Sequence, residues 1–157
     1  MELVSILVPV FNERSTLREC LERVLAVELG VERELVVADD GSTDGSQDVL
    51  RELARDHPEV RPVFLPVNRG KGAALAAALG ESRGTIAVVQ DADLEYDPRD
   101  IPRLLAPILD GRADAVYGSR LAAGAERRVL YYRHALGNRL VTLVSNLLTD
   151  LNLTDVE

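Results

Sequence analysis

The 157-residue sequence is 46% hydrophobic and 28% charged, which is typical of one folded domain rather than of a disordered chain. Its net charge of −8 argues against a general nucleic-acid-binding protein, because binding to a phosphate backbone requires a basic face. A single cysteine, Cys20, excludes an internal disulfide and a multi-cysteine metal cluster, and it fits a reducing compartment. Because no secretory signal or membrane-spanning apolar run is present either, we expect a cytoplasmic protein.

The spacing of apolar residues predicts alternating strands and helices. In chain order, the expected elements are a strand at 3–10, a helix at about 15–27, a strand at 34–38, a helix at about 46–55, a strand at 60–65, a helix at 73–79, a strand at 85–90, a helix from 97 to about 109, a strand at 113–117 and a helix at about 131–148. This alternation indicates an α/β domain of three layers (α/β/α, Rossmann-like) with a mainly parallel sheet. Prolines in and around the third strand favour an edge position for it. We expect residues 1–157 to form a single domain, truncated at its C-terminal end because no sixth strand follows.

Two acidic residues, Asp91 and Asp93, directly follow the fourth predicted strand. The carboxyl ends of strands in an open α/β sheet are where ligands bind. Carboxylates so close together repel each other unless a cation, a proton or hydrogen-bond donors lie between them. Mg²⁺ is typically held by one or two carboxylates together with substrate phosphates. The pair therefore predicts a metal–diphosphate site, although a solvated acidic turn fits the same two residues.

Two further polar loops follow the second and third predicted strands. Residues 39–46 (Asp-Asp-Gly-Ser-Thr-Asp-Gly-Ser) could accept hydrogen bonds from a nucleobase or from ribose hydroxyls, while Asp44 and Ser46 fit equally well as caps of the next helix. Residues 68–72 (Asn-Arg-Gly-Lys-Gly) place Lys71 and small residues at a helix N-terminus, which favours an anion. This loop lacks the Walker spacing, and Leu75 stands where a dinucleotide fingerprint has its third glycine.

Four motifs therefore occur in order along the chain, at Val8–Glu13, Val37–Asp44, Asn68–Gly72 and Asp91–Asp93. Together they resemble the family-two glycosyltransferases of the GT-A fold and, within that family, the dolichyl- or polyprenyl-phosphate sugar transferases. The resemblance spans nearly the whole chain. It implies a metal-dependent, inverting transfer of a sugar from a GDP- or UDP-linked donor to a polyprenyl or dolichyl phosphate.

The resemblance also implies roles for individual residues, to which the anion-binding loop adds Lys71. The expected donor-binding residues are Pro9, Phe11, Glu13, Ala38, Asp40, Lys71, Asp91, Ala92, Asp93 and Arg120. Ala38 and Asp40 would contact the base, and Arg120 would approach the donor sugar or the phosphates. Mg²⁺ or Mn²⁺ would be held by Asp91, Asp93 and Glu95. Relatives often have Tyr where this chain has Phe11, and many have Gln at position 95.

The chemistry of the acceptor decides which other residues are expected to act. A lipid phosphate is already an anion, so it needs cations to position it rather than a general base. The cations available for this are Arg120, Arg127, Arg128 and Arg133. A hydroxyl acceptor would instead need a carboxylate base, for which Asp155 is the best-placed candidate. The expected catalytic residues are thus Asp93, Arg120 and Asp155.

Alternatives to this interpretation are a nucleotide-sugar-binding fragment without turnover and a family-two transferase that acts on a saccharide hydroxyl. A sugar nucleotidyltransferase fits less well, because it would carry a Gly-rich loop where this sequence has Phe11–Arg14. A dehalogenase-type phosphatase would place its Asp-x-Asp after the first strand. The amphipathic pattern at 131–148 fits a peripheral membrane contact, packing on the core, or a homodimer contact.

Overall fold

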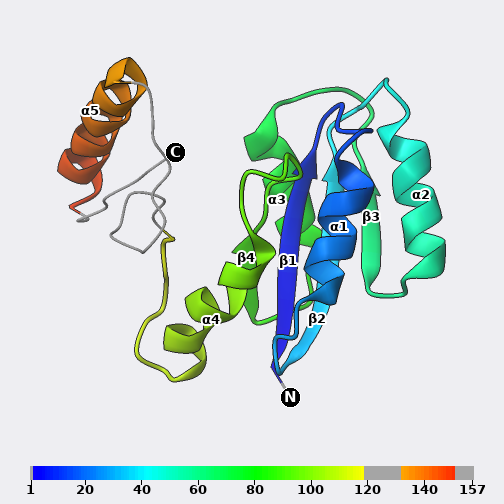
Figure 1. Cartoon of the computed structure of the whole chain (residues 1–157), viewed down its shortest axis with the longest axis horizontal. Coiled ribbons are helices and arrows are strands. Elements are labelled where there is room, and N and C mark those ends of the chain that lie inside the picture. Colours follow the sequence, from blue (N-terminus) through cyan, green and yellow to red (C-terminus); the bar gives the residue numbers. More distant parts are fainter. Residues whose placement is uncertain (1, 119–131, 151–157) are drawn as a thin grey trace. The chain divides into compact units, whose positions relative to one another are not determined.

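The computed structural model describes residues 2–118 and 132–150 of the chain (Figure 1). These residues fall into two compact units, which divide after Pro102. The first unit contains a four-stranded sheet, made of β1 (Leu3–Val10), β2 (Glu32–Asp39), β3 (Val60–Phe64) and β4 (Ile86–Val89). The prediction of a single domain over residues 1–157 stays a prediction.

All neighbouring strands of the sheet run parallel, in the order β3-β2-β1-β4. Four of the five predicted strands are thereby confirmed, and β3 lies at an edge as its prolines predicted. Continuous apolar runs in β1 and in the second half of β2 explain why these strands take the centre, where both faces of the sheet are covered.

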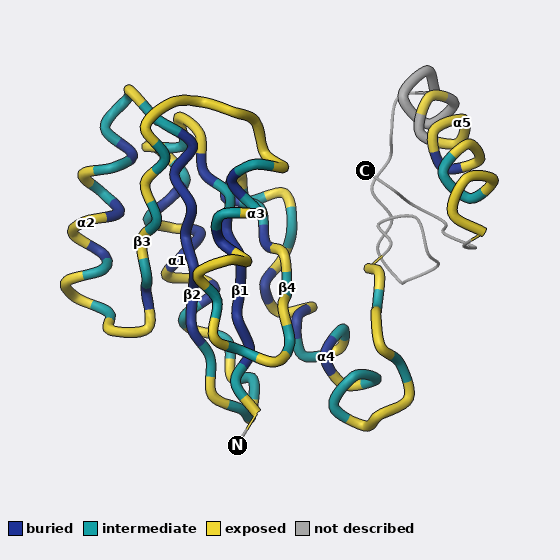
Figure 2. Tube along the Cα trace, turned by 180° about the vertical axis from the view of Figure 1, so that it is seen from behind, coloured by how far each residue is buried: buried dark blue, intermediate teal, exposed yellow. Residues whose placement is uncertain are grey.

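Helices cover both faces of the sheet, which confirms the three-layer prediction. Figure 1 shows α1 (Leu17–Ala26) in front of the strands and α3 (Lys71–Glu81) behind them. Leu7, Val36 and Ala38 pack with Ala74 and Ala78 of α3 on one face. Because side chains alternate along a strand, the even-numbered residues of β1, Val4, Ile6, Val8 and Val10, face the layer of α1 and α2 (Ser46–Asp56). Figure 2 shows the buried residues concentrated along β1, β2 and the inner sides of the helices.

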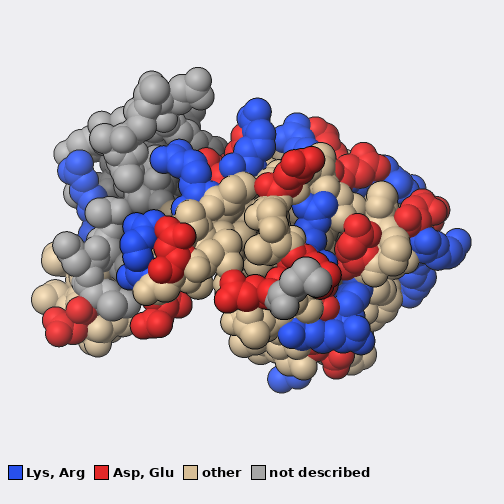
Figure 3. Space-filling view, turned by 90° about the horizontal axis from the view of Figure 1, so that it is seen from below, with Lys and Arg blue, Asp and Glu red and all other residues tan. Residues whose placement is uncertain are grey.

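Charged residues of both signs are interspersed on the face shown in Figure 3. One ion pair joins neighbouring helices: the Arg18 guanidinium lies 2.8 Å from the Glu52 carboxylate, and so links α1 to α2. Both side chains are largely exposed, so this pair contributes at most about 1 kcal/mol to stability.

The helix predicted from residue 97 is confirmed as a short 3-10 turn, Pro98–Asp100, followed by α4 (Ile101–Leu109). Asp97 begins it as a cap, because its carboxylate accepts a hydrogen bond from the Arg99 amide at 3.0 Å. The strand predicted at 113–117 is wrong, since these residues form an irregular segment with a bend at Asp114. The amide of Ala113 donates to the Pro107 carbonyl at 3.1 Å, so the chain here ends α4 instead of entering a ladder.

The last predicted helix is confirmed as α5 (Tyr132–Thr149) in the second unit. Several large apolar side chains on it are exposed: Leu140, Val141, Leu143, Val144, Leu147 and Leu148. Within the described ranges, none of the helices has both the length and the apolar character needed to cross a membrane.

Candidate functional site

A cavity of about 320 Å³ lies outside the carboxyl ends of β1, β2 and β4. The chain runs outward from β1 through β2 to β3 and then returns to place β4 on the other side of β1. Such a switch point in an open α/β sheet is where ligands bind. The residues that line the cavity are Pro9, Val10, Phe11, Glu13, Asp40, Asn68, Gly70, Lys71, Ala74, Asp91, Ala92 and Asp93. The structure thus brings most of the predicted donor-binding residues into one place.

Other predicted site residues do not line this cavity. The Ala38 side chain is fully buried against α3, so any contact with a base would have to come from its backbone. Glu95 is exposed beyond the cavity lining. Arg120 and Asp155 lie outside the described residues, as do Arg127 and Arg128. Arg133 lies in α5, but its side chain is also outside the description.

The loops after β1 and β2 are joined by hydrogen bonds that hold the cavity's wall. Asn12 adopts a left-handed conformation (φ 57°), and its amide donates to the Ser42 hydroxyl at 2.9 Å. In return, the Thr43 amide donates to the Asn12 side-chain oxygen at 3.0 Å. The Glu13 amide donates to the Ser46 hydroxyl at 2.9 Å. Glu13 and Phe11 are therefore held in position by the loop that carries Asp40.

Asp44 and Ser46 stabilise these two loops by hydrogen bonds and do not line the cavity. The Asp44 carboxylate accepts from the Ser46 hydroxyl at 2.6 Å, from the Ser46 amide at 2.9 Å and from the Arg14 amide at 3.0 Å. Partial burial acts to raise the pKa of Asp44, but these hydrogen bonds outweigh it and hold the pKa below its ordinary value. The N-cap position of α2 is Gly45, which makes no side-chain cap, but the Asp44 carboxylate accepts the amide of Ser46, the first residue of the helix.

Asp40 joins the loop after β2 to the segment before α3. Its two carboxylate oxygens accept the amides of Arg69 at 2.9 Å and Gly70 at 2.7 Å. A side-chain carbon added at Gly41 would lie 2.8 Å from the Asn68 backbone, so this close approach requires glycine. Asp40 is only 2% exposed, but each carboxylate oxygen has a second lone pair that can accept from a ligand in the cavity.

The acidic pair after β4 is neutralised by the first residue of α3. The Lys71 ammonium lies 2.7 Å from one Asp91 oxygen and 2.8 Å from the other. Asp93 is exposed, and its carboxylate accepts the Glu95 amide at 2.9 Å across Leu94, which has a left-handed φ of 64°. The repulsion expected between two neighbouring carboxylates is thus relieved by a cation of the chain itself.

The backbone of Asp91 is supported from below by two residues that the sequence did not indicate. The Cys20 thiol of α1 donates to the Asp91 carbonyl at 3.4 Å, and the Gln90 side-chain amide donates to the same oxygen at 3.1 Å. Burial raises the pKa of the Cys20 thiol to about 11, and the negative charges of Asp93 and Asp91 add to the rise. Cys20 is therefore an unreactive structural thiol.

The donor set fits a hard divalent cation that shares its ligands with a phosphate. Within residues 2–118 and 132–150, no group of three or more His, Cys, Asp or Glu side chains is arranged to hold a metal. The chain offers instead the two carboxylates of Asp91 and Asp93 in one cavity. Mg²⁺ and Mn²⁺ prefer oxygen ligands, and Mg²⁺ is commonly bound by one or two carboxylates with water and substrate phosphates completing the shell.

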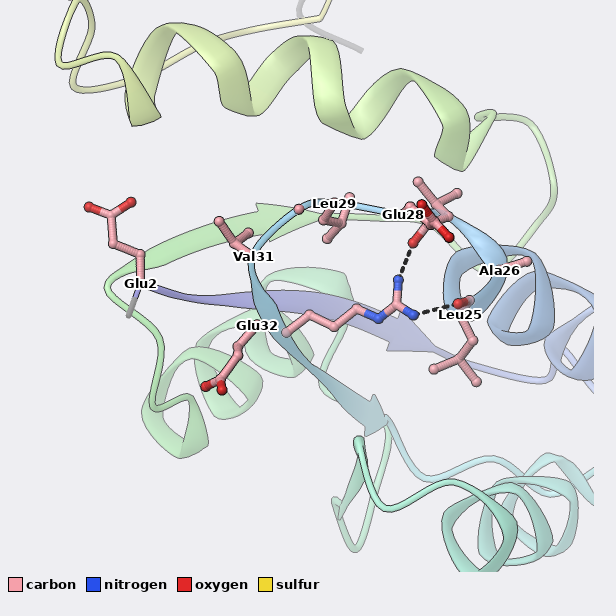
Figure 4. A pocket seen from close by; sticks show the side chains of 10 residues that line it. Glu2, Leu25, Ala26, Glu28, Leu29, Val31 and Glu32 are labelled. Carbon is pink, nitrogen blue, oxygen red and sulfur yellow. Dashed lines mark hydrogen bonds between the residues drawn. The ribbon is translucent and has the colours of Figure 1, made fainter.

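A second, more open cavity of about 690 Å³ lies at the amino ends of β1 and β2 (Figure 4). Its only cation among the described residues, Arg33, donates to the carbonyls of Val24, Leu25 and Val27. These carbonyls lie at the end of α1, where a helix runs out of amide donors, so Arg33 caps the helix and has little capacity left for an anion.

Residues 5–154 match the model of the family described as glycosyl transferase family 2. The chain belongs to this family. Its fold is accordingly the α/β fold of the GT-A glycosyltransferases, as the four motifs predicted.

Family members of known function are similar to the chain over most of its length. One is an undecaprenyl-phosphate 4-deoxy-4-formamido-L-arabinose transferase of Pseudomonas aeruginosa, 42% identical over 114 residues that make up 71% of this chain and 34% of the relative. The chain thus spans about a third of the length of the curated relatives it matches.

Two solved structures of GT-A glycosyltransferases are similar to the chain. A mannosyltransferase from Pyrobaculum calidifontis in complex with GDP-Man and Mn²⁺ is 34% identical, with a TM-score of 0.54 over 63% of this chain and 29% of that one. A glucosyl-3-phosphoglycerate synthase from Mycobacterium tuberculosis, in complex with Mn²⁺, UDP and glucosyl-3-phosphoglycerate, is 31% identical, with a TM-score of 0.56 over 69% of this chain and 40% of that one.

Proposed function

We propose that the chain is a metal-dependent, inverting glycosyltransferase that moves a sugar from a nucleoside-diphosphate sugar to a polyprenyl phosphate. The observation that carries this proposal is the cavity at the switch point, where Asp91 and Asp93 meet the ends of β1 and β2. Membership of glycosyl transferase family 2 makes a sugar nucleotide the fitting occupant of that cavity.

The nucleoside would bind on the side of the cavity formed by the ends of β1 and β2. The Phe11 ring is 45% exposed at the cavity and offers a face on which a base can stack. Asp40 can accept from the imide or amino group of a base, and Glu13 from a ribose hydroxyl. This arrangement suits guanine and uracil alike, and the two structural relatives hold GDP-Man and UDP.

The diphosphate would bind between Asp91, Asp93 and Lys71. A bound Mg²⁺ or Mn²⁺ neutralises charge that develops on the leaving diphosphate, and both structural relatives contain Mn²⁺. Asp91 and Asp93 would hold that ion and orient the diphosphate, while the aromatic and apolar wall around Phe11, Val10 and Ala74 would exclude water from the base. Glu95 as a third ligand stays a prediction.

A polyprenyl phosphate is proposed as the acceptor because the curated relatives are named as undecaprenyl-phosphate sugar transferases. Such an acceptor attacks as an anion, so the chain needs cations to orient it rather than a base. Arg120, Arg127, Arg128 and Arg133 remain the proposed cations, and Asp155 the proposed base for a hydroxyl acceptor. A lipid acceptor would place the enzyme at the cytoplasmic face of a membrane, and a homodimer there stays a prediction.

The test is a transfer assay with the 157-residue chain, undecaprenyl phosphate and a panel of GDP- and UDP-linked sugars, with Mn²⁺ or Mg²⁺. We expect a glycosyl-phosphoryl lipid from at least one donor, and no product when the metal is chelated. Binding of sugar nucleotides without product would contradict the enzyme proposal for this chain and support a sugar-nucleotide-binding fragment.

A further inference from the structure

We propose that Lys71 is an exchangeable counter-ion. Its ammonium pairs with the Asp91 carboxylate when no metal is bound, and it moves to the donor diphosphate when a divalent cation binds to that carboxylate. The inference rests on the proposed function, because it assumes that Asp91 and Asp93 hold the metal. It adds a mechanism by which metal and donor bind together rather than one by one.

The contact geometry places Lys71 where a metal would have to bind. Its ammonium faces both oxygens of Asp91, at 2.7 and 2.8 Å. A divalent cation bound to either oxygen would lie against the ammonium, and two cations that close repel each other. Metal binding to Asp91 therefore requires that Lys71 withdraw.

The two partners differ in their freedom to move. The Lys71 side chain is 59% exposed, whereas the Asp91 side chain is 18% exposed. The Asp91 backbone is also held by Cys20 and Gln90. Lysine has a flexible four-carbon stem, so the ammonium can leave while the carboxylate stays in place.

The charges around the cavity explain why the empty site needs such a counter-ion. Four acids line it, Glu13, Asp40, Asp91 and Asp93, and Lys71 is the one cationic side chain among the lining residues. Removing Lys71 leaves the acids unscreened until a metal arrives.

The position of Lys71 also provides its second partner. It is the first residue of α3, an 11-residue helix whose N-terminus faces the cavity. Anions bind well at helix N-termini, because the free amides and the helix dipole attract them. A diphosphate at the metal would therefore lie within the field of both α3 and the released ammonium. Metal and diphosphate should strengthen each other's binding by the same factor.

The sequence provides a direct probe of the exchange, because Lys71 is its only lysine. Reductive methylation with ¹³C-formaldehyde labels this side chain and the N-terminal amine, and it preserves the positive charge. We expect the Lys71 methyl resonance to shift when Mg²⁺ and GDP or UDP are added together, and much less with Mg²⁺ alone. A resonance that stays unchanged in the complex would overturn the exchange.

Substitution of Lys71 then measures how much its charge weakens Mn²⁺ binding, in titrations that detect free Mn²⁺ by electron paramagnetic resonance. Lys71→Gln should bind Mn²⁺ alone about tenfold more tightly than the wild type, and the factor by which GDP or UDP strengthens Mn²⁺ binding should fall about tenfold. The matched control is Arg69→Gln. It also removes one positive charge, two residues from Lys71 in the sequence, but the Arg69 side chain does not line the cavity. It should change either quantity less than about twofold.

The outcomes separate this inference from the proposed function. If Lys71→Gln binds Mn²⁺ alone no better than the wild type while both bind Mn²⁺ with a nucleotide, the counter-ion proposal is wrong and the metal–nucleotide site stands. If Asp93→Asn and the wild type bind Mn²⁺ equally, with or without nucleotide, the ion is not held in this cavity and both proposals fail.

Discussion

Glu34, near the amino end of the sheet, and the pair Asp91 and Asp93, at its carboxyl end, differ in how firmly their charges are held. At the amino end, Glu34 accepts from the Ser5 hydroxyl at 2.7 Å, the Arg83 amide at 2.6 Å and the Arg61 guanidinium at 2.8 Å. At the carboxyl end, Asp91 has one exposed lysine as its partner, and Asp93 accepts from a single amide beside it. The first acid is fixed within the fold, and the second pair is open to an incoming cation.

The same contrast holds for the cations and cavities at the two ends. Arg33 at the amino end is committed to main-chain carbonyls, while Lys71 at the carboxyl end is exposed on a carboxylate. The larger cavity therefore lies at the end where the one cation among the described lining residues is already bonded to the main chain. Cavity size alone would favour the amino end, whereas the switch point of the sheet, where ligands bind in open α/β folds, lies at the carboxyl end.

The largest effect is expected for Asp93→Asn at the open end. Loss of a metal-holding carboxylate should lower the rate of sugar transfer about a thousandfold, because charge on the leaving diphosphate is no longer neutralised. Circular dichroism should show an unchanged fold. The control, Asp56→Asn, alters an exposed acid at the end of α2 and should keep the wild-type rate.

A matched pair of glycines tests whether the close approach of the loop after β2 to the segment before α3 constrains the backbone at Gly41. Gly41 and Gly30 have nearly the same φ, +72° and +71°, but an added side-chain carbon meets the Asn68 backbone at 2.8 Å only at Gly41. Gly41→Ala should lower the free energy of unfolding by about 3 kcal/mol, and Gly30→Ala by about 1 kcal/mol. Equal losses in urea denaturation would show that the close approach carries no cost.

Glu34→Gln should lower the free energy of unfolding by about 2 kcal/mol at pH 7, because the Arg61 charge loses its buried partner. Burial acts to raise the pKa of Glu34, but hydrogen bonds from Arg83, Ser5 and Arg61 outweigh it and lower the pKa from its ordinary value of 4.5. A lowered pKa in the folded state stabilises the fold above pH 4.5, and that stability is lost as the pH falls through the folded-state pKa. The difference between wild type and variant should therefore shrink below that pH, as measured by urea denaturation. A difference that stayed constant down to pH 2.5 would contradict this.

The smallest effect is expected from the support beneath Asp91. Cys20→Ala should cost about 1 kcal/mol of stability and weaken Mn²⁺–nucleotide binding about threefold, because a buried thiol and its weak hydrogen bond are lost. Cys20→Ser restores a donor and should recover the binding but not all of the stability. Binding that is equally weak in both variants would argue that the thiol fills space rather than positions Asp91.

Much of the fold and of the cavity lining could be predicted, because the spacing of apolar residues and the positions of Gly, Pro and Asp in turns are local properties of the sequence. Apolar runs ending in Asp40 and Asp91 fixed both the strands and the edge at which their acids meet. The strand at 113–117 could not be excluded, because the amide of Ala113 is committed to α4 by a contact that no local pattern shows. Ala38 was placed at the base by resemblance, although strand alternation puts its side chain on the same face as Val36, in the core.

Contacts between distant segments account for the rest. The approach of Cys20 to Asp91 joins residues 71 positions apart, and that of Lys71 to Asp91 joins residues 20 positions apart. Neither pairing has a sequence signal, since both depend on how α1 and α3 pack on the sheet. The acidic pair therefore lies at the carboxyl edge of the sheet, as the sequence predicted, but only the structure shows that Lys71 pairs with Asp91.

The central claim is that the open end of the sheet binds a nucleoside diphosphate through a divalent cation. It is tested most directly by calorimetric titration of the wild-type chain with GDP and with UDP, once with Mn²⁺ and once with excess chelator. We expect at least one nucleotide to bind with Mn²⁺ and to bind at least about tenfold more weakly without it. Equal affinity under the two conditions would contradict the account.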